Sequence, residues 1–412
     1  MACILFIHQN FPGQFRHIAP ALANHGHQVH ALAITGQATP GVSLHSYRPS
    51  KGSSTSIHPL ASEFETKVIR AEACGQAMLQ LKANGLMPDL VIAHPGWGEA
   101  LFVKDVWKQT SLLSFLEFYY ATSGTDVGFD PEFSKQGFFE DARLRVKNAN
   151  NLLSLEISDF GLSPTNWQKQ SHPQWTQDRI QVIFDGVDCD ILKPNPSVRL
   201  NLKRETGESF SLTSKDEIIT FVNRNLEPYR GYHSFMRALP KILSARPNAR
   251  VLIVGGDGVS YGAKAPEGKT WKQIFLDEVK SRIDLERVHF LGNVPYPIFT
   301  QLLQLSSCHV YLTYPFVLSW SCIEALSTGC LVIGSDTGPV REVIEHGVNG
   351  LLVDFFNYEA IADAVIRSLS DPASFIRMRQ NARASAKDSY DLRSVCLPKQ
   401  LALIESILAK HR

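Results

Sequence analysis

Short apolar runs separated by amphipathic segments recur along the chain. Residues 3–7, 28–34 and 89–93 have the length and composition expected of buried parallel strands, and residues 15–25 place apolar side chains at helical spacing. The chain therefore begins with a strand, a helix and a second strand, which is the unit that builds a parallel sheet. This pattern predicts an α/β protein whose ligands bind at the carboxyl ends of the strands.

The same alternation continues in the second half of the chain. The runs predicted as strands there are residues 218–223, 249–254, 288–291 and 331–333. Helical spacing follows in residues 358–369, 375–387 and 395–410. A chain of 412 residues that repeats the pattern in each half is longer than one ordinary domain, so two domains are predicted.

Polar segments interrupt this pattern. Residues 36–56 are rich in Gly, Ser, Thr and Pro and predict a long surface loop, and residues 123–136 predict a second exposed loop. The proline-bearing residues 192–197 and the polar residues 199–215 predict a linker and its surface lead-in. Residues 261–272 exceed the length that a turn needs and predict a lid or a surface insertion.

Residues 311–353 contain the most informative pattern. A strand that ends at Tyr314-Pro315 is followed by helical spacing in residues 319–327 and by a further strand at residues 331–333. A loop containing Gly338 then leads into a second helix, predicted to carry Arg341, Glu342 and Glu345. The start of a helix presents unpaired N–H groups and a positive dipole, so this loop suits a phosphate group.

The composition narrows the class of protein. The chain is 44% hydrophobic and 20% charged, as in a globular enzyme, and its net charge of +1 lacks the basic excess of a nucleic-acid binder. The seven dispersed cysteines predict reduced thiols in a cytoplasmic protein. No signal peptide or membrane-spanning run is evident, but the basic helix at residues 138–149 leaves peripheral contact with the inner face of the membrane open.

Several motifs of the second half occur in a characteristic order: Glu324-Ala325, Gly329, Gly338 with Glu342, and the closing stretch 347–353. This order resembles the donor-sugar half of the retaining glycosyltransferases of family 4. The resemblance implies an α/β fold of the GT-B type, in which two Rossmann-like domains have parallel sheets that face each other across a cleft.

The resemblance also implies where the domains divide. Residues 185–188, Asp-Gly-Val-Asp, resemble the junction between the two domains of the family. We therefore predict an acceptor domain at residues 1–186 and a nucleotide-sugar donor domain at residues 187–389. The family folds its C-terminal helices back across the hinge, so the helix at about residues 390–412 is expected on the first domain.

Two arginines follow the first strand of the donor domain. Arg224 and Arg230 match the family positions, an arginine and usually a lysine, that bind the diphosphate. The chemistry also stands without the resemblance, because a departing nucleoside diphosphate gains negative charge and fixed cations stabilise that charge most in the transition state. Arginine offers a bidentate fork to phosphate oxygens. Two surface arginines at a helix start are the alternative interpretation.

The resemblance assigns the remaining donor contacts. Glu324 matches the glutamate that binds the ribose, whereas Phe316 stands where the family has another glutamate, close to the donor sugar. Phe316 would give the sugar pocket a more apolar wall, which Ser319 and Trp320 help to shape. The other residues expected to contact the donor are Gly256, Val294, Thr337 and Gly338.

Three segments of the first half contain candidates for the acceptor side. Gly13 matches the family's glycine loop after the first strand, or Pro12-Gly13 simply turns the chain. His94, with Trp97 and Glu99, follows a predicted strand and either lines the acceptor site or belongs to a packed Pro-Gly turn. Glu117 is the carboxylate at the place where the family often has a His or an Asp, facing the transfer centre, and is a candidate base.

The predicted activity is transfer of a sugar from a nucleotide diphosphate donor to a hydroxyl acceptor, with retention at the anomeric carbon, in polysaccharide or glycoconjugate synthesis. The acceptor is a saccharide, a lipid-linked molecule or a small molecule. The resemblance implies no metal and no cofactor besides the nucleotide-sugar co-substrate. A nucleotide-sugar epimerase, a sugar phosphorylase and a catalytically inactive nucleotide-sugar-binding protein remain the alternatives.

Overall fold

A computed structural model describes residues 1–135, 137–203, 207 and 209–410. Contacts divide the chain into two compact units. Unit 1 comprises Met1–Gly128, Ser134–Asp185 and Arg393–Arg412, and unit 2 comprises Phe129–Phe133 and Gly186–Leu392. The five residues of Phe129–Phe133 are therefore part of unit 2, although the predicted boundary at residue 186 assigns them to the first domain.

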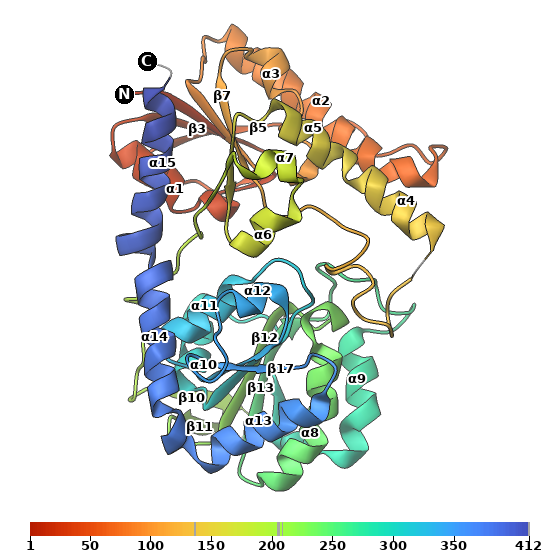
Figure 1. Cartoon of the computed structure of the whole chain (residues 1–412), viewed down its shortest axis with the longest axis vertical. Helices are drawn as coiled ribbons and strands as arrows, with labels where there is room; N and C mark the ends of the chain where they lie inside the picture. The colour runs from red at the N-terminus through yellow and green to blue at the C-terminus, as the bar shows by residue number, and fades with distance from the viewer. Residues whose placement is uncertain (136, 204–206, 208, 411–412) are drawn as a thin grey trace. The chain divides into compact units, whose positions relative to one another are not determined.

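Unit 1 is built on a parallel sheet with the strand order β5-β3-β1-β6-β7-β8-β9 (Figure 1). Its strands are β1 (Cys3–Ile7), β3 (Gln28–Ala33), β5 (Val42–Ser46), β6 (Leu90–Ala93), β7 (Ser111–Phe115), β8 (Phe160–Ser163) and β9 (Ile180–Val182). A small separate pair joins β2 (Asn10–Phe11) to β4 (Thr35–Gly36). Because both faces of β1 are buried, its sequence is apolar throughout rather than alternating.

Helices cover both faces of this sheet. Ile4 and Phe6 pack in a cluster with α1 and α15, whereas Leu5 and Ile7 pack on the opposite face in a cluster with α2. The helices of unit 1 are α1 (Ile18–Asn24), α2 (Ser62–Ala83), α3 (Val103–Val106), α4 (Phe138–Lys147), α5 (Ala149–Ile157), α6 (Asn166–Ser171), α7 (Gln174–Gln177) and α15 (Leu397–Ala409). The C-terminal helix α15 thus contributes Ile404, Ile407 and Leu408 to the core of unit 1.

Unit 2 contains a second parallel sheet, with the order β14-β13-β12-β15-β16-β17. Its strands are β12 (Ile218–Asn225), β13 (Arg250–Gly256), β14 (Val288–Phe290), β15 (Cys308–Tyr311), β16 (Val332–Ser335) and β17 (Leu351–Val353). Its helices are α8 (Tyr232–Ala245), α9 (Trp271–Val279), α10 (Tyr296–Leu305), α11 (Trp320–Ser327), α12 (Gly338–Arg341), α13 (Tyr358–Ser370) and α14 (Ile376–Tyr390).

Each sheet reverses its direction of growth once. In unit 1 the chain places β3 and β5 on one side of β1 and then returns to place β6 on the other side. In unit 2 the same reversal separates β12 from β15. Crossover connections leave β1 and β6, and likewise β12 and β15, in opposite directions, which opens a crevice at the carboxyl ends of those strands. The fold therefore predicts one ligand region in each unit.

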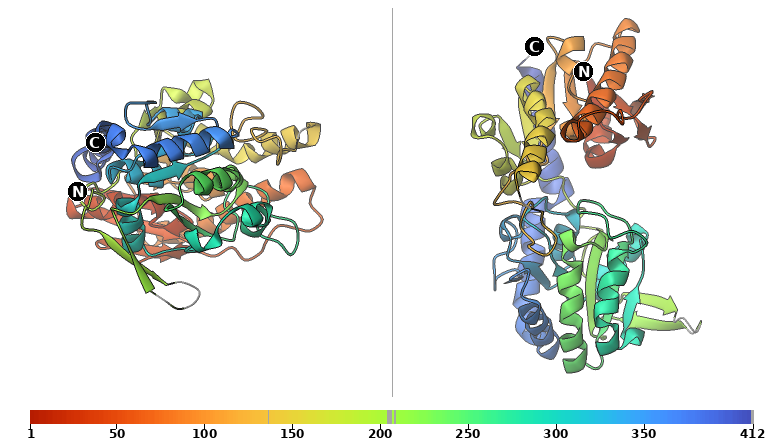
Figure 2. Two further views of the ribbon diagram at one scale, coloured as in Figure 1. Left: turned by 90° about the horizontal axis from the view of Figure 1, so that it is seen from below. Right: turned by 90° about the vertical axis from the view of Figure 1, so that its right-hand side faces the viewer.

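Three local predictions are wrong. The expected linker at residues 199–215 contains an antiparallel hairpin of β10 (Arg199–Lys203) and β11 (Ser209–Thr213), which extends away from the sheet of unit 2 (Figure 2). The expected surface loop at residues 36–56 contains the edge strand β5. Polar and exposed side chains in β5 make its apolar pattern too weak to predict a strand. The helix expected to carry Glu342 and Glu345 ends at Arg341.

The described parts of the chain contain no helix that is both long enough and apolar enough to cross a membrane.

His309 on β15 makes the stability of unit 2 depend on pH. The ring is fully buried, its Nδ1 atom lies 2.9 Å from Oγ1 of Thr220 on β12, and burial lowers its pKa to about 4. An unfolded histidine titrates near 6.5, so the unfolded chain gains a proton as the pH falls below that value while folded His309 stays neutral. The free energy of unfolding should therefore fall with pH between about 6.5 and about 4, by at most about 1.4 kcal/mol per pH unit for this residue.

Urea unfolding at pH 7 and pH 5 checks this expectation. His309→Gln should lose less stability than the wild type between the two pH values, and the surface substitution His58→Gln serves as the matched control. An equal loss in the wild type and in His309→Gln would show that His309 is not the source of the pH dependence.

Candidate active site

The predicted donor residues lie at or just after the carboxyl ends of the strands of unit 2. Arg224 is the second-last residue of β12, Gly256 is the last residue of β13, Val294 follows β14, Phe316 follows β15 and Thr337 follows β16. Parallel strands end at one edge of their sheet, so these residues share that edge. β12 and β15 are the neighbouring strands at which the sheet reverses, and the two arginines and Phe316 lie at the ends of these strands or in the loops after them.

The guanidinium of Arg230 is buried and fixed by two acceptors. Its Nη1 atom donates to Oγ1 of Thr313 at 2.6 Å and to the carbonyl oxygen of Val317 at 3.1 Å, and the residue is 5% exposed. Both acceptors lie in the loop after β15, whereas Arg230 lies in the loop after β12. The charge of Arg230 thereby links the two loops at the reversal point of the sheet. Arg224, in contrast, is exposed at the end of β12.

Gly231 allows Arg230 to occupy this place. Its φ angle is +70°, and a Cβ atom on it would lie 2.3 Å from Cβ of Leu312. A side chain would therefore meet both an unfavourable backbone conformation and the start of the loop after β15. Further along that loop, the Tyr311 hydroxyl accepts hydrogen bonds from N and Oγ of Ser319, at 2.9 and 3.0 Å.

Aromatic rings surround the guanidinium of Arg230. The ring of Tyr261 lies 5.0 Å from the guanidinium carbon, within the range of a cation–π contact. Phe316 is buried and packs against Tyr229 and Tyr261, with ring centroids 5.2 Å apart in both cases. Tyr229, Tyr261 and Phe316 therefore form an aromatic cluster, of which Tyr261 is the exposed member.

Glu227 shapes the loop that carries Tyr261. Its carboxylate is fully buried and accepts three backbone N–H hydrogen bonds, from Ser260 at 3.1 Å, Tyr261 at 3.3 Å and Gly262 at 3.0 Å. Three amide donors satisfy a buried carboxylate that would otherwise be strongly destabilising. The start of the segment predicted to be a lid or an insertion is thus an ordered turn that places Tyr261 over Arg230.

Asn225 braces the same turn beside Gly256. Its side chain accepts a hydrogen bond from the backbone of Gly258 at 3.2 Å and donates to the Ser260 hydroxyl at 2.8 Å. A Cβ atom on Gly256 would lie 2.8 Å from Oδ1 of Asn225, so a side chain at this position would displace the Asn225 side chain. Gly256 therefore permits the close approach of the loops after β12 and β13.

Glu324 on α11 is oriented by a tyrosine from α10. The Tyr296 hydroxyl donates to Oε1 of Glu324 at 2.8 Å, and Glu324 is 5% exposed. Tyr296 begins α10 two residues after Val294, so this hydrogen bond connects the segment of one expected donor contact, Val294, to the expected ribose contact, Glu324. Trp320 is the first residue of α11 and is partly buried.

The loop after β16 packs against the loop after β15. The Ser335 hydroxyl lies 3.2 Å from the Thr337 hydroxyl and accepts a hydrogen bond from the backbone N–H of Thr313 at 3.0 Å. Thr337 is buried, and Gly338 begins the short helix α12. Ser335 therefore connects the predicted phosphate loop to the residue that fixes Arg230.

In unit 1 the corresponding edge carries a cluster of uncharged and acidic groups. Nε2 of His8 donates to Oε1 of Gln14 at 2.8 Å, and Nε2 of Gln14 donates to Oε1 of Glu117 at 3.4 Å. Nε2 of His94 lies 3.5 Å from the other carboxylate oxygen of Glu117. These residues follow β1, β6 and β7, the three neighbouring strands that include the reversal point.

Backbone contacts indicate which ring nitrogen carries the proton when each of the two histidines is neutral. Nδ1 of His8 accepts a hydrogen bond from the backbone of Asn10 at 3.0 Å, and Nδ1 of His94 accepts one from Gly96 at 3.2 Å. A neutral histidine that accepts at Nδ1 carries its proton on Nε2. Both Nε2–H groups therefore point into the cluster, that of His94 toward Glu117.

The cluster holds a neutral imidazole beside an ionised carboxylate. Burial, and to a smaller extent the neighbouring His94, lower the pKa of His8 to about 4. Burial alone would raise the pKa of Glu117, but contact with His94 and the hydrogen bond from Gln14 hold it below the ordinary value. Glu117 is thus a negatively charged acceptor near neutral pH, with its side chain 35% exposed.

The other first-half candidates have packing roles in the structure. Gly13 lies against His8, since a Cβ atom on it would be 2.4 Å from the imidazole, and its φ angle is +47°. The ring of Trp97 stacks on His94 with the centroids 4.2 Å apart. Glu99, expected with them, is fully buried and accepts a hydrogen bond from the Tyr47 hydroxyl at 2.8 Å, so it lines no surface.

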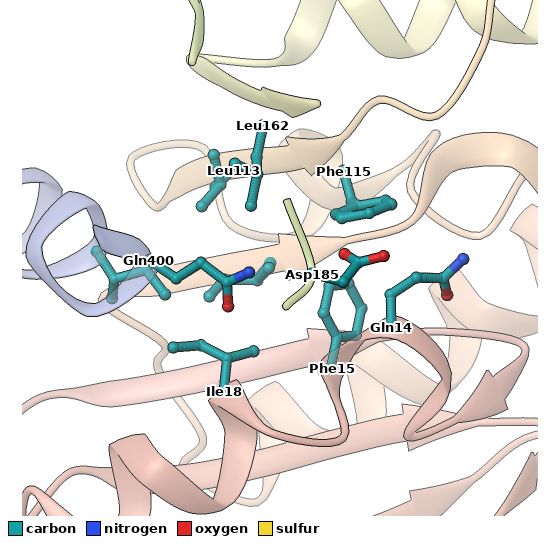
Figure 3. A pocket seen from close by; sticks show the side chains of 10 residues that line it. Gln14, Phe15, Ile18, Leu113, Phe115, Leu162, Asp185 and Gln400 are labelled. Atoms are coloured by element: carbon teal, nitrogen blue, oxygen red, sulfur yellow. The ribbon is translucent and has the colours of Figure 1, made fainter. Parts of the chain in front are cut away.

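A largely apolar pocket in unit 1 adjoins this cluster (Figure 3). Gln14 belongs to both, and Phe15 and Phe115 form the neighbouring wall. The complete lining is Gln14, Phe15, Ile18, Ile92, Leu113, Phe115, Leu162, Asp185, Gln400 and Ile404. Gln400 comes from α15, so the C-terminal helix supplies part of the wall.

The sequence does not predict the roles of Glu227, Tyr261 and Tyr296, because these residues act through tertiary contacts. In the sequence, a glutamate near two arginines looks like a member of an ordinary surface ion pair. The one available signal is the position of Glu227 between Arg224 and Arg230 in a proline-containing turn. Within the described ranges, no group of three or more His, Cys, Asp or Glu residues is arranged to hold a metal ion.

Comparison with known proteins identifies the two halves of the chain. Residues 25–192 match the glycosyl transferase family 4 group, and residues 203–386 match the glycosyl transferases of group 1. The D-inositol 3-phosphate glycosyltransferase of Corynebacterium efficiens is 24% identical over 370 residues, 83% of this chain and 80% of that protein. An uncharacterized glycosyltransferase of Methanocaldococcus jannaschii is 28% identical over 218 residues, 52% of this chain and 51% of that protein.

Solved structures share the fold over the whole chain. Sucrose-phosphate synthase from Thermosynechococcus elongatus superposes with a TM-score of 0.73 at 17% identity, over 100% of both chains. HepE of Anabaena, in complex with UDP and glucose, superposes with a TM-score of 0.67 at 18% identity, over 98% of this chain and 100% of that one. The predicted fold class, GT-B with two Rossmann-like domains, is thereby confirmed. The chain belongs to the group 1 glycosyl transferases, with a first half of the family 4 group.

Proposed function

We propose that the protein transfers a sugar from a nucleoside diphosphate donor to a hydroxyl group, with retention of configuration at the anomeric carbon. The observation that carries the proposal is the buried guanidinium of Arg230, fixed by Thr313 and Val317 at the reversal point of the second sheet. A cation fixed at that point suits an anionic ligand, and the nucleotide-sugar donors of this family supply one.

The donor diphosphate would bind between fixed and adaptable cations. Arg230 is immobilised before the ligand arrives, so it stabilises the charge on the departing diphosphate without reorganisation. Arg224 is exposed at the end of β12 and can adjust to the second phosphate. In the retaining reaction that we propose, an oxygen of the departing diphosphate takes the proton of the acceptor hydroxyl as the new glycosidic bond forms on the same face.

Glu324 would bind the ribose through its carboxylate. Its Oε1 atom already accepts from Tyr296, which fixes the carboxylate and orients it for a diol. Val294, Gly256, Thr337 and Gly338 would provide backbone or hydroxyl contacts from the adjacent strand ends. The sugar itself would meet Phe316, Ser319 and Trp320, of which Phe316 offers no hydrogen-bonding group.

Glu117 would bind the acceptor hydroxyl rather than act as an isolated base. Its carboxylate is ionised near neutral pH, and Gln14 and His94 hold it in one orientation. Such an acceptor can align a hydroxyl group for attack. The acceptor would be a saccharide, a lipid-linked molecule or a small polyol, in polysaccharide or glycoconjugate synthesis.

The proposed reaction can be tested with nucleotide sugars and a panel of hydroxyl acceptors. Release of the nucleoside diphosphate should accelerate when the correct acceptor is present, and NMR should show that the anomeric configuration of the product equals that of the donor. An inverted product would contradict retention, and the absence of release with every donor would contradict the activity.

Arg230→Ala should weaken nucleoside diphosphate binding by roughly 10- to 100-fold. This range corresponds to the loss of one hydrogen-bonding charged group, which contributes about 1.5–3 kcal/mol. Isothermal calorimetry with UDP measures this change. Arg282→Ala, an exposed arginine of the same unit, is the matched control and should bind as the wild type does. Unchanged affinity in Arg230→Ala would contradict the phosphate role.

Glu324→Gln should weaken UDP binding about tenfold because the charged acceptor for the ribose hydroxyls is lost. A 2′,3′-dideoxy analogue of UDP separates this role from a general loss of structure. The wild type should bind UDP better than the analogue, whereas Glu324→Gln should bind both alike. If the variant keeps the preference of the wild type, Glu324 does not read the ribose.

Chelation should leave donor binding and turnover unchanged. Arg224 and Arg230 supply positive charge at the position where a divalent cation would otherwise neutralise the diphosphate. Calorimetry and turnover assays with EDTA, and again with added Mg²⁺ or Mn²⁺, measure the effect. A gain of about tenfold or more with either ion would show that the arginines are not sufficient.

A further inference from the structure

The segment Phe129–Phe133 is inserted into unit 2 by two aromatic anchors. The ring of Phe129 lies 5.2 Å from Tyr314, 5.3 Å from Phe355 and 5.0 Å from Phe356. The ring of Phe133 lies 5.3 Å from both His233 and Trp271 and 6.1 Å from Phe275. Between the anchors the segment carries two carboxylates, Asp130 and Glu132, in very different surroundings.

Asp130 is buried and accepts from two side-chain donors and one backbone donor, the N–H group of Glu132, which lies 3.0 Å from its Oδ1 atom. It is 2% exposed, and its Oδ2 atom accepts a hydrogen bond from the Tyr314 hydroxyl at 2.7 Å and lies 3.1 Å from Nε2 of His233. Burial would raise the pKa of this carboxyl, but hydrogen bonds from His233 and Tyr314 lower it below the ordinary value. Asp130 therefore remains an ionised acceptor that fixes the Tyr314 hydroxyl.

Tyr314 lies within the loop that immobilises Arg230. Thr313 and Val317, the two acceptors of the guanidinium, stand on either side of it in sequence. The backbone N–H of Tyr314 donates to the carbonyl of Tyr229 at 3.1 Å, and the two rings lie 4.7 Å apart. Tyr229 directly precedes Arg230. Tyr314 therefore contacts the loop that carries Arg230, and it lies in the loop that provides the acceptors of the guanidinium.

We propose that Asp130 is a positioning residue for donor binding, which acts through the Tyr314 hydroxyl to hold the loop that fixes Arg230. This role rests on the proposed function, because it concerns the affinity of the same phosphate site. In this proposal Asp130 acts on the donor only through Tyr314. Its contribution comes from a segment whose sequence neighbours on both sides belong to unit 1, so the first half of the chain completes the donor site of unit 2.

The chemistry of the contact favours positioning over simple attachment. The aromatic anchors already attach the segment, and burying a carboxylate costs several kcal/mol unless its partners compensate. A carboxylate can accept from Tyr314 and His233 together, which sets the direction of the Tyr314 hydroxyl. Attachment alone would not require a charged group at a position with 2% exposure.

Glu132 provides a matched control on the same segment. Its carboxylate pairs with Arg237 through contacts of 2.7 and 2.9 Å at the surface. Arg237 also pairs with Glu278, so it keeps an acidic partner when Glu132 is replaced. Glu132→Gln therefore loosens the attachment of the segment without altering the contact between Asp130 and Tyr314.

The test measures nucleoside diphosphate affinity in full-length variants. Calorimetry uses whichever of UDP, GDP, ADP and dTDP the wild type binds most tightly, and the melting temperature is recorded in parallel. Asp130→Asn and Tyr314→Phe should each raise the dissociation constant about tenfold, and Glu132→Gln should not change it. The double variant of Asp130→Asn and Tyr314→Phe should bind no more weakly than Tyr314→Phe alone, because both substitutions remove the same hydrogen bond.

Tyr314→Phe retains the ring that packs against Phe129 and Tyr229, so it decides the question if Asp130→Asn does not fold. A lower melting temperature with an unchanged dissociation constant in both variants would overturn the positioning role and leave the proposed function standing. An equal loss of affinity in Glu132→Gln would also overturn it, because attachment alone would then account for the effect. If the wild type binds no nucleoside diphosphate, both proposals fail.

Discussion

The structure of unit 2 is arranged around one buried cation. Removing the guanidinium of Arg230 from water would be strongly destabilising if it found no acceptors, and the loop after β15 supplies two, Thr313 and Val317. Those contacts tie the loop after β12 to the loop after β15, the strands between which the sheet reverses. The geometry of the candidate phosphate site is therefore a consequence of satisfying that charge.

Other buried polar groups secure the same region. Glu227 organises the turn that places Tyr261 over the guanidinium, and Gly231 gives the backbone room beside Leu312. Each contact is local, yet together they leave Arg230 with little freedom before a ligand binds. Preorganisation of this kind is the physical basis for selective stabilisation of a charge that grows during the reaction.

The two units use the same sheet topology for different chemistry. In unit 1 the reversal point carries a neutral imidazole, His8, and an ionised carboxylate, Glu117, whereas unit 2 presents arginine at the equivalent place. An ionised carboxylate suits a hydroxyl donor and repels phosphate, whereas a guanidinium attracts phosphate. This difference in charge assigns the acceptor to the first unit and the donor to the second in the proposed reaction.

Sequence patterns are sufficient for the buried parallel strands and the family, because short apolar runs such as residues 3–7 and 218–223, bounded by polar segments, are typical of strands buried on both faces. The sequence pattern does not predict the paired strands β10 and β11 or the edge strand β5, since exposed strands lack the apolar signal on which the prediction depends. Asp130 and Glu227 were missed for another reason. Their burial is created by residues distant in sequence, and one sequence alone does not distinguish such a carboxylate from a surface one.

In the proposed function, the edge of the second sheet binds the diphosphate of a nucleotide sugar. Calorimetric titration of the wild-type protein with UDP, GDP, ADP and dTDP, without added metal, measures this binding. We expect saturable, one-to-one binding with a clear preference for one base, and competition by the matching nucleotide sugar. Absence of binding to all four diphosphates would exclude the proposed donor site.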